Sequence, residues 1–343
     1  MGQVAYIESD KVYLAAMAKA KRIKGINCKA SASHGVKLVL LTRFEELVGF
    51  QEAALNWTDP EGVHSMRVAS RRLRSALRDF APYVRKRPLA SVLKQLRRIA
   101  DSLGEVRDQD VAIMALEKMV THAPADFASA LQQFIAGKRE LRDRSREALQ
   151  PILEKTALSE LEADFIVGVA AATAVRVQRT QTTPEVSFLM MSQAVIQERL
   201  REFEKLSNGL FRPFEIENLH EMRIGAKRLR YAIELFQQCW GRSIAGYAKR
   251  AARIQTALGD VHDCDVWIES VGKQILQARK TKENDQITAL MWLLSHLVKL
   301  RTKHLRAAFT RWREWELQDA SGKLRAVLQK ELPEKGTKDT QTN

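Results

Sequence analysis

The stretch GVHSMRVASRRLRSALRDF, which runs from Gly62 to Phe80, decides the fold of this chain. When its residues are placed at about 100° per residue, the apolar and the basic side chains separate onto different sides of one helix. The apolar side consists of Met66, Leu73, Leu77, Phe80 and, one turn further on, Val84. The basic side spans roughly 80° and consists of His64, Arg67, Arg71, Arg74 and Arg78. The sequence therefore predicts a helix over residues 62–84 that buries one side and turns a cationic side away from the core.

The same pattern returns later in the chain as NLHEMRIGAKRLRYAIELF, from Asn218 to Phe236. The offset between the two stretches is 156 residues, the distance from His64 to His220. A second motif, LGEVRDQDV at 103–111, returns as LGDVHDCDV at 258–266, an offset of 155. Two linked motifs at nearly one offset predict an internal duplication.

The second copy of the basic side is slightly less basic than the first. It consists of His220, Arg223, Lys227 and Arg230. It lies opposite the apolar residues Met222, Leu229, Ile233, Phe236 and Trp240. Glu234 stands at the position that Arg78 occupies in the first copy, so we expect the two copies to be inequivalent.

The rest of the chain also has helical periodicity. Apolar residues recur at intervals of three and four, without sustained alternation of period two, so we expect an all-α fold. The duplication then gives two pseudo-symmetric helical bundles with about four long helices each. We expect an N-terminal extension (1–33), a first bundle (34–156), a connecting helix and linker (157–185), a second bundle (186–325) and a disordered polar tail (326–343). The predicted helices are 36–56, 62–84, 89–103, 109–120, 127–155, 158–179, 186–206, 216–240, 244–258, 264–280 and 284–317.

Composition points to an anionic partner. The 343 residues include 56 Lys and Arg against 41 Asp and Glu, which gives a net charge of +15. Such a chain attracts polyphosphate, nucleic acid and anionic membrane surfaces alike. The three cysteines, Cys28, Cys239 and Cys264, are too few and too scattered to predict a disulfide framework. Together with the lack of a signal-peptide or membrane-spanning pattern, they favour a cytoplasmic protein that does not insert into a membrane.

Further basic residues lie on helices that can pack beside the two His-led helices. Arg139, Arg142 and Arg146 form a stripe with spacings of three and four, as do Lys299, Lys303 and Arg306. Lys94, Arg98 and Arg253 lie on the helices that lead into the Leu-Gly motifs. If the two bundles turn these residues toward one another, they form a channel in which guanidinium groups grip phosphate oxygens in pairs.

The acidic residues of the second motif allow three interpretations. Glu105, Asp108 and Asp110, with Asp260, Asp263 and Asp265, can cap helices that begin after each Leu-Gly, which is the interpretation that we favour. They can instead orient neighbouring arginines, or hold a metal ion. We expect no metal site and no cofactor. His64 and His220 are expected to bind an anion and not to catalyse, because the helix side around them offers only cations.

The paired motifs resemble those of the CHAD family, the conserved histidine α-helical domains. The residues that carry the resemblance are His64, Arg67, Arg71, Arg72, Leu73 and Arg74, then Leu103, Gly104, Arg107, Asp108, Asp110 and Val111, with their repeats from His220 and Leu258. The resemblance implies two pseudo-symmetric bundles around a central basic surface or pore that binds polyphosphate, often in proteins found with polyphosphate granules. It implies that the ligands include His64, Arg67, Arg71, Arg74, His220, Arg223, Lys227 and Arg230. Sulfate or phosphate can occupy such a site.

One departure from the pattern is that His262 stands where the first copy has Arg107. Another is that the chain lacks the strand-rich tunnel domain that hydrolyses triphosphate in some relatives. We therefore expect a non-enzymatic binder, with a nucleic-acid-binding helical protein and a polyphosphate-processing enzyme as the alternatives.

Overall fold

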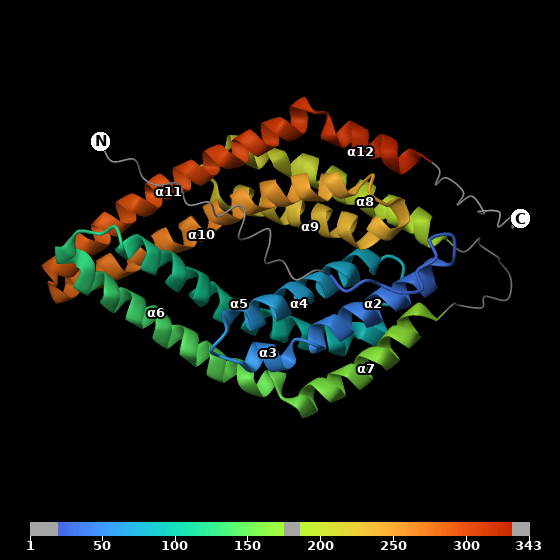
Figure 1. Cartoon of the computed structure of the whole chain (residues 1–343), viewed down its shortest axis with the longest axis horizontal. Coiled ribbons are helices and arrows are strands. Elements are labelled where there is room, and N and C mark those ends of the chain that lie inside the picture. The colour runs from blue at the N-terminus through green and yellow to red at the C-terminus, as the bar shows by residue number, and fades with distance from the viewer. Residues whose placement is uncertain (1–19, 175–185, 331–343) are drawn as a thin grey trace, which may run out of the picture. The chain divides into compact units, whose positions relative to one another are not determined.

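The computed structural model describes residues 20–174 and 186–330, and the chain divides into two compact units. Of the described residues, 20–26 and 33–174 belong to the first unit, and 27–32 and 186–330 belong to the second. Every regular element in these ranges is helical, apart from one isolated bridge between Ser31 and Ser187. The prediction of an all-α fold is confirmed (Figure 1).

The first unit contains α2 (Ala32–Val48), α3 (Gln51–Leu55), α4 (Pro60–Phe80), α5 (Ala90–Val120), α6 (Ala128–Leu149) and α7 (Lys155–Thr173). Helix α4 begins where the sequence signals a start, because the Asp59 side chain accepts a hydrogen bond from the backbone N–H of Glu61 and Pro60 occupies the first turn. Helix α5 packs against both α4 and α6. The predicted helix over 36–56 is broken into α2 and α3 at Gly49 and Phe50.

The second unit contains α8 (Phe188–Leu206), α9 (Ile216–Trp240), α10 (Ala245–Thr281), α11 (Asn284–Leu317) and α12 (Ala320–Gln329). Helix α10 packs against both α9 and α11, as α5 packs against α4 and α6. Helix α12 was not predicted, and its buried Leu324 and Leu328 correct the expectation that the disordered tail begins at residue 326. Residues 331–343 of the predicted tail lie outside the described residues.

The two Leu-Gly motifs lie inside long helices, so the prediction that a helix ends at each of them is wrong. Residues 103–111 are part of α5, and residues 258–266 are part of α10. A helical glycine costs only about 1 kcal/mol relative to alanine, which packing readily overrides. A Cβ at Gly104 would lie 3.9 Å from Nε of Arg67, and one at Gly259 would lie 4.0 Å from Cδ of Arg223. Each glycine thus faces an arginine of the neighbouring helix, and the acidic residues after it are not helix caps.

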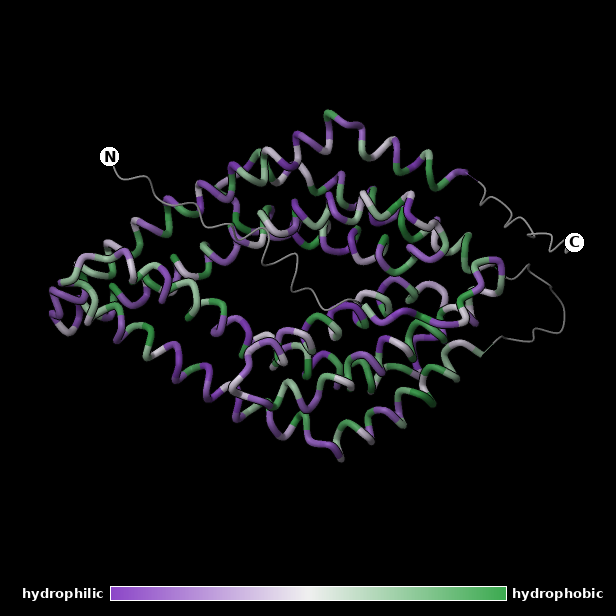
Figure 2. The backbone as a smooth tube through the Cα atoms, viewed as in Figure 1, coloured by the Kyte–Doolittle hydropathy of each residue, from purple (hydrophilic) through white to green (hydrophobic). Residues whose placement is uncertain are grey.

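The apolar sides of α4 and α9 form the cores as predicted. Met66, Leu73, Phe80 and their counterparts Met222, Leu229 and Phe236 are completely buried. Figure 2 shows the corresponding alternation of hydrophobic and hydrophilic residues along the helices. In the second unit Phe203 packs edge-on against Trp312 and Trp315, and both tryptophans are buried in the core.

Helix α7, predicted as a connector, contributes to the core of the first unit. Its Phe165 stacks on Phe44 of α2 with 4.3 Å between the ring centroids, and Phe165 is fully buried. A Cβ at Gly168 would lie 2.9 Å from the carbonyl oxygen of Pro88, so α7 approaches the backbone before α5 closely. Residues 175–185 of the predicted linker lie outside the described part of the chain.

Matching interactions recur in the two units at the offset found in the sequence. Glu46 bonds to Arg43 and Arg72 in the first unit, and Glu202 bonds to Arg199 and Arg228 in the second. Each member of the second triad follows its counterpart by 156 residues. These contacts support the duplication that the sequence predicts.

A disulfide joins Cys28 and Cys239, although the sequence predicted no disulfide framework. The two residues are 211 positions apart, so their spacing gave no sign of the bond. Around it, the backbone N–H groups of Phe188 and Leu189 donate to the carbonyl oxygens of Ala30 and Cys28, each at 2.8 Å. The bond and these contacts hold residues 27–32 against the start of α8 and the end of α9.

Candidate functional site

In the first unit, α4 and α5 bring four predicted ligands together. His64, Arg67 and Arg71 lie on successive turns of α4 and are half-buried, and Arg107 of α5 is buried. Burial, then the positive charges of Arg107, Arg71 and Arg67, lower the pKa of His64 to about 4. An imidazole that senses three guanidinium groups marks a place where positive charge is concentrated. We call His64, Arg67, Arg71 and Arg107 the first cluster.

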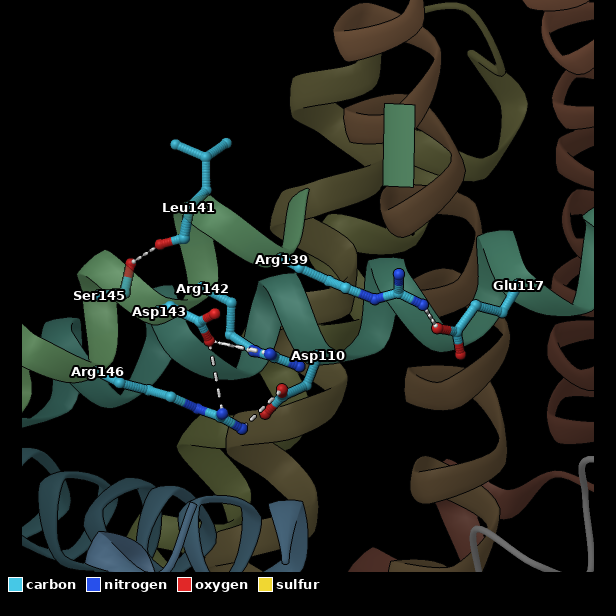
Figure 3. Close-up of polar contacts among 8 residues, drawn as sticks. All are labelled: Asp110, Glu117, Arg139, Leu141, Arg142, Asp143, Ser145 and Arg146. Carbon is cyan, nitrogen blue, oxygen red and sulfur yellow. Dashed lines mark hydrogen bonds and ion pairs between the residues drawn. The ribbon is translucent and has the colours of Figure 1, made fainter. Parts of the chain in front are cut away.

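Acidic residues of α5 hold arginines around the first cluster. Arg67 Nη2 donates to Asp108 Oδ1 at 2.9 Å. Asp110 Oδ1 lies 3.6 Å from Arg146 Nη2 of α6 (Figure 3). Burial raises the pKa of Asp110, while Arg146, Arg107 and Arg142 act in the opposite direction. Asp110 is therefore the acidic residue between the first cluster and the stripe on α6.

Within that stripe, the three arginines have different roles. Arg142 and Arg146 both contact Asp143 of their own helix and both act on Asp110. Arg139 instead donates to Glu117 at 2.6 Å, at the other side of the view in Figure 3. Two of the three predicted ligands thus join the surroundings of the first cluster.

The other basic residues predicted on α4 and α5 extend beyond the first cluster. Arg74 is 3.9 Å from Asp101, and Arg78 is 3.4 Å from Asp79 and also donates to Ser75 Oγ. Lys94 and Arg98 are exposed on α5, about two turns or more before Arg107. These four residues lie on the same two helices. The cations that lower the pKa of His64 are instead Arg67, Arg71 and Arg107.

The second unit brings together His220, Arg223 and Lys227 of α9 with His262 of α10, which we call the second cluster. The Nδ1 atoms of the two histidines are 3.4 Å apart, and their ring centroids are 4.6 Å apart. Burial and the charges of Arg223, His220 and Lys227 lower the pKa of His262 to about 4. The pKa of His220 is lowered by burial, Arg223 and Lys227. The positive surroundings of the first cluster thus have a counterpart here.

Arg230 differs from the sequence prediction, which placed it on the open basic side of α9. Its side chain is buried, and Nε donates to Glu234 at 2.7 Å while Nη1 donates to Gln255 at 3.3 Å. Its guanidinium also lies over the ring of Tyr231. The negatively charged Glu234, which replaces Arg78, explains why this arginine turns inward.

Sequence reasoning missed Arg301, the counterpart of Arg146. Arg301 Nε donates to Asp265 Oδ1 at 2.5 Å, and its Nη2 donates to the carbonyl oxygen of Pro213 at 2.9 Å. The pairs Asp110 with Arg146 and Asp265 with Arg301 are both related by an offset of 155, so extending the offset of the Leu-Gly motif to α11 would have found it. The residues predicted in its place, Lys299, Lys303 and Arg306, are exposed on α11.

Arg253 lies elsewhere on the second unit. It lines a surface pocket formed by α10 and α11 with Arg250, Arg311, Glu314, Trp315 and Gln318.

Asp108, Asp110 and Asp265 each pair with an arginine of another helix, which fits the interpretation that the acidic residues orient arginines. In residues 20–174 and 186–330, no three His, Cys, Asp or Glu side chains are grouped so that they could hold a metal ion.

No helix in the described part of the chain is long and apolar enough to cross a membrane.

The fold and the site together define a class: helical proteins with His-led, arginine-rich helices in two units. The sequence profile of the CHAD domain matches residues 38–272, more than half of the chain. The protein belongs to the CHAD domain family.

Two solved structures have a similar fold. The CHAD domain from the plant Ricinus communis is 21% identical, with a TM-score of 0.64 over 86% of this chain and 96% of that one. PptA from Streptomyces chartreusis is 14% identical, with a TM-score of 0.60 over 83% of this chain and 100% of that one. No curated protein matches the sequence.

Proposed function

We propose that this protein binds inorganic polyphosphate through the first and second clusters and does not change it chemically. The observation that carries the proposal is the convergence of cations on an imidazole in each unit. Burial, and after it the charges of neighbouring cations, lower the pKa of His64 and that of His262 to about 4. A cation that is partly buried has lost some of its hydration, so its electrostatic interaction with a bound anion is stronger than at a fully exposed site.

Polyphosphate suits these residues because its repeating oxygens can be gripped by several of them at once. Each guanidinium group offers a planar pair of donors to phosphate oxygens, and Lys227 offers a point charge. Asp108 holds Arg67 of the first cluster, and Asp110 and Asp265 hold Arg146 and Arg301. Arginines held in place in this way lose less entropy when an anion binds. The CHAD family is associated with polyphosphate, which supports the choice of this anion. The channel shared by both bundles stays a prediction, as do the cytoplasmic location and the association with granules.

Binding without chemistry is part of the proposal. The groups in both clusters are cations and imidazoles, and the carboxylates of Asp108, Asp110 and Asp265 are engaged by Arg67, Arg146 and Arg301. Each of these three carboxylates would have to leave its ion pair to act as a general base or to hold a metal ion. We expect no release of phosphate when the protein is incubated with polyphosphate and Mg²⁺ or Mn²⁺. Release in proportion to protein concentration would show that the protein is an enzyme.

Competition separates polyphosphate from nucleic acid. Labelled DNA is bound to the protein and then displaced with long-chain polyphosphate at equal salt and equal phosphate concentration. We expect polyphosphate to displace the DNA, because the basic sides of α4 and α9 lack aromatic residues between the cations for base stacking. If DNA is retained, or binds more tightly than polyphosphate, the proposed function is wrong.

A further inference from the structure

The clusters differ most at one pair of corresponding positions, Arg107 in the first and His262 in the second. Arginine keeps its positive charge at any pH relevant to a protein, whereas a histidine charges only when it gains a proton. Before an anion arrives, the second cluster therefore has one fewer fixed charge than the first. It has two imidazole rings at the place where the first cluster has one imidazole and one guanidinium.

The two imidazoles are placed to share a proton. Their Nδ1 atoms face each other at 3.4 Å, and the rings are tilted by 52°. Two bare lone pairs at this separation repel, so one Nδ1 carries hydrogen and points at the other. A further proton makes the pair an imidazolium hydrogen-bonded to an imidazole, and charge-assisted hydrogen bonds of this kind are stronger than neutral ones.

The charged groups around the pair oppose that further proton in the free protein. On α9, Arg223 and Lys227 disfavour it, while Glu217 and Glu221 favour it at His220. The same Arg223 and Lys227 of α9 also disfavour a proton on His262 of α10. Asp260 and Asp263 flank His262 in sequence, and on α11 His304 lies 3.4 Å from Asp260, beside Lys303. Burial is the largest cause that lowers the pKa of both histidines, and Arg223 and Lys227 of α9 are the main cations that add to it.

An anion bound to Arg223 and Lys227 would offset their positive charge and would itself attract a proton to the neighbouring imidazoles. We propose that His220 and His262 form a proton-binding site that fills when a phosphate anion occupies the second cluster. The pair then supplies, on binding, the charge that Arg107 supplies permanently in the first cluster. This inference rests on the proposed function and adds that the second unit takes up a proton with its ligand.

The test compares the wild type with His262→Arg, which gives the second cluster the residue of the first. Tripolyphosphate is titrated calorimetrically at one pH, between about 4 and 6.5, in buffers of different ionisation heat, which yields the number of protons taken up. We expect the wild type to take up more protons than the variant, by up to one per molecule. The affinity of the wild type should also gain up to about tenfold per pH unit over that of the variant as the pH falls.

Nuclear magnetic resonance gives a second measurement in the wild-type protein. The ring proton of His262, identified by its absence in His262→Arg, should titrate at higher pH with tripolyphosphate present than without it. His220→Gln should abolish most of that change. Equal proton uptake by two proteins that both bind, or an unchanged titration of His262, would overturn the proton proposal alone. If the wild type does not bind tripolyphosphate or long-chain polyphosphate at any pH, the proposed function itself fails.

Discussion

Gly62 tests the packing of the first unit at the scale of one residue. A Cβ at this position would lie 1.8 Å from the carbonyl oxygen of Ala53, far inside contact distance. We expect Gly62→Ala to lower the free energy of unfolding by about 3 kcal/mol or more, because backbone atoms have to move. Urea denaturation followed by circular dichroism measures the change.

Gly137→Ala is the matched control for that substitution. Gly137 is also helical, but a Cβ there meets no atom within 4 Å. Alanine is the better helix former, so this variant should be more stable than the wild type by about 0.5–1 kcal/mol. A Gly62→Ala protein as stable as Gly137→Ala would contradict the close approach of α3 to α4.

The buried carboxylate Glu46 gives a second prediction at this scale. Its side chain is 4% exposed and it pairs with Arg43 and Arg72, which are 7% and 8% exposed. Glu46→Gln removes the carboxylate that pairs with two buried guanidinium groups, so we expect a loss of about 3–5 kcal/mol in unfolding free energy. Glu202→Gln removes the corresponding carboxylate, which is 20% exposed, and should cost clearly less. Equal losses measured by denaturation would show that burial does not set the strength of these triads.

Helix positions were predicted well where the termini carry local signals. The predicted helices 216–240 and 284–317 agree with α9 and α11, and α9 ends at Gly241, whose φ of 62° favours glycine. Reading a glycine as the end of a helix gave the wrong result at Gly104 and Gly259. A glycine that faces an arginine and a glycine that ends a helix look alike in the sequence. Helix α12 was missed because its 10 residues are fewer than the window of about 11–18 residues over which a helical period is recognised, although Leu324, Val327 and Leu328 have helical spacing.

The disulfide belongs to the scale of elements, since it fastens residues 27–32 to α9. We expect Cys28→Ser with Cys239→Ser to lower the unfolding free energy by about 2–5 kcal/mol, because the bond closes a long loop in the unfolded chain. A reductant should lower the thermal midpoint of the wild type and leave that of the double variant unchanged. If the reductant affects both proteins equally, or neither, the bond does not contribute to stability.

At the scale of the whole molecule, the sequence predicted which residues form the centre of each cluster better than which residues surround it. Arg67, Arg71 and Arg223 lie where the helical periodicity placed them, because positions within one helix follow from its geometry. Arg230 was predicted on the wrong side of α9, and Arg301 was not predicted. Their orientations depend on hydrogen bonds to Glu234 and Asp265, which a helical wheel does not show. The basic residues of α6 and α11 were paired because both sets have spacings of three and four. The repeat offset of 155 was not applied to them, so Arg301, the counterpart of Arg146, was missed.

The most direct test of the central claim reverses one charge in each cluster. Arg71→Glu with Lys227→Glu changes the net charge by the same amount as Arg144→Glu with Arg313→Glu, which alters exposed arginines outside both clusters. Binding of long-chain polyphosphate is measured for both double variants at one salt concentration, with circular dichroism to confirm folding. The account predicts that the cluster variant folds and binds at least about 100-fold more weakly, while the control stays within a few-fold of the wild type. A folded cluster variant that binds as tightly as the control would contradict it.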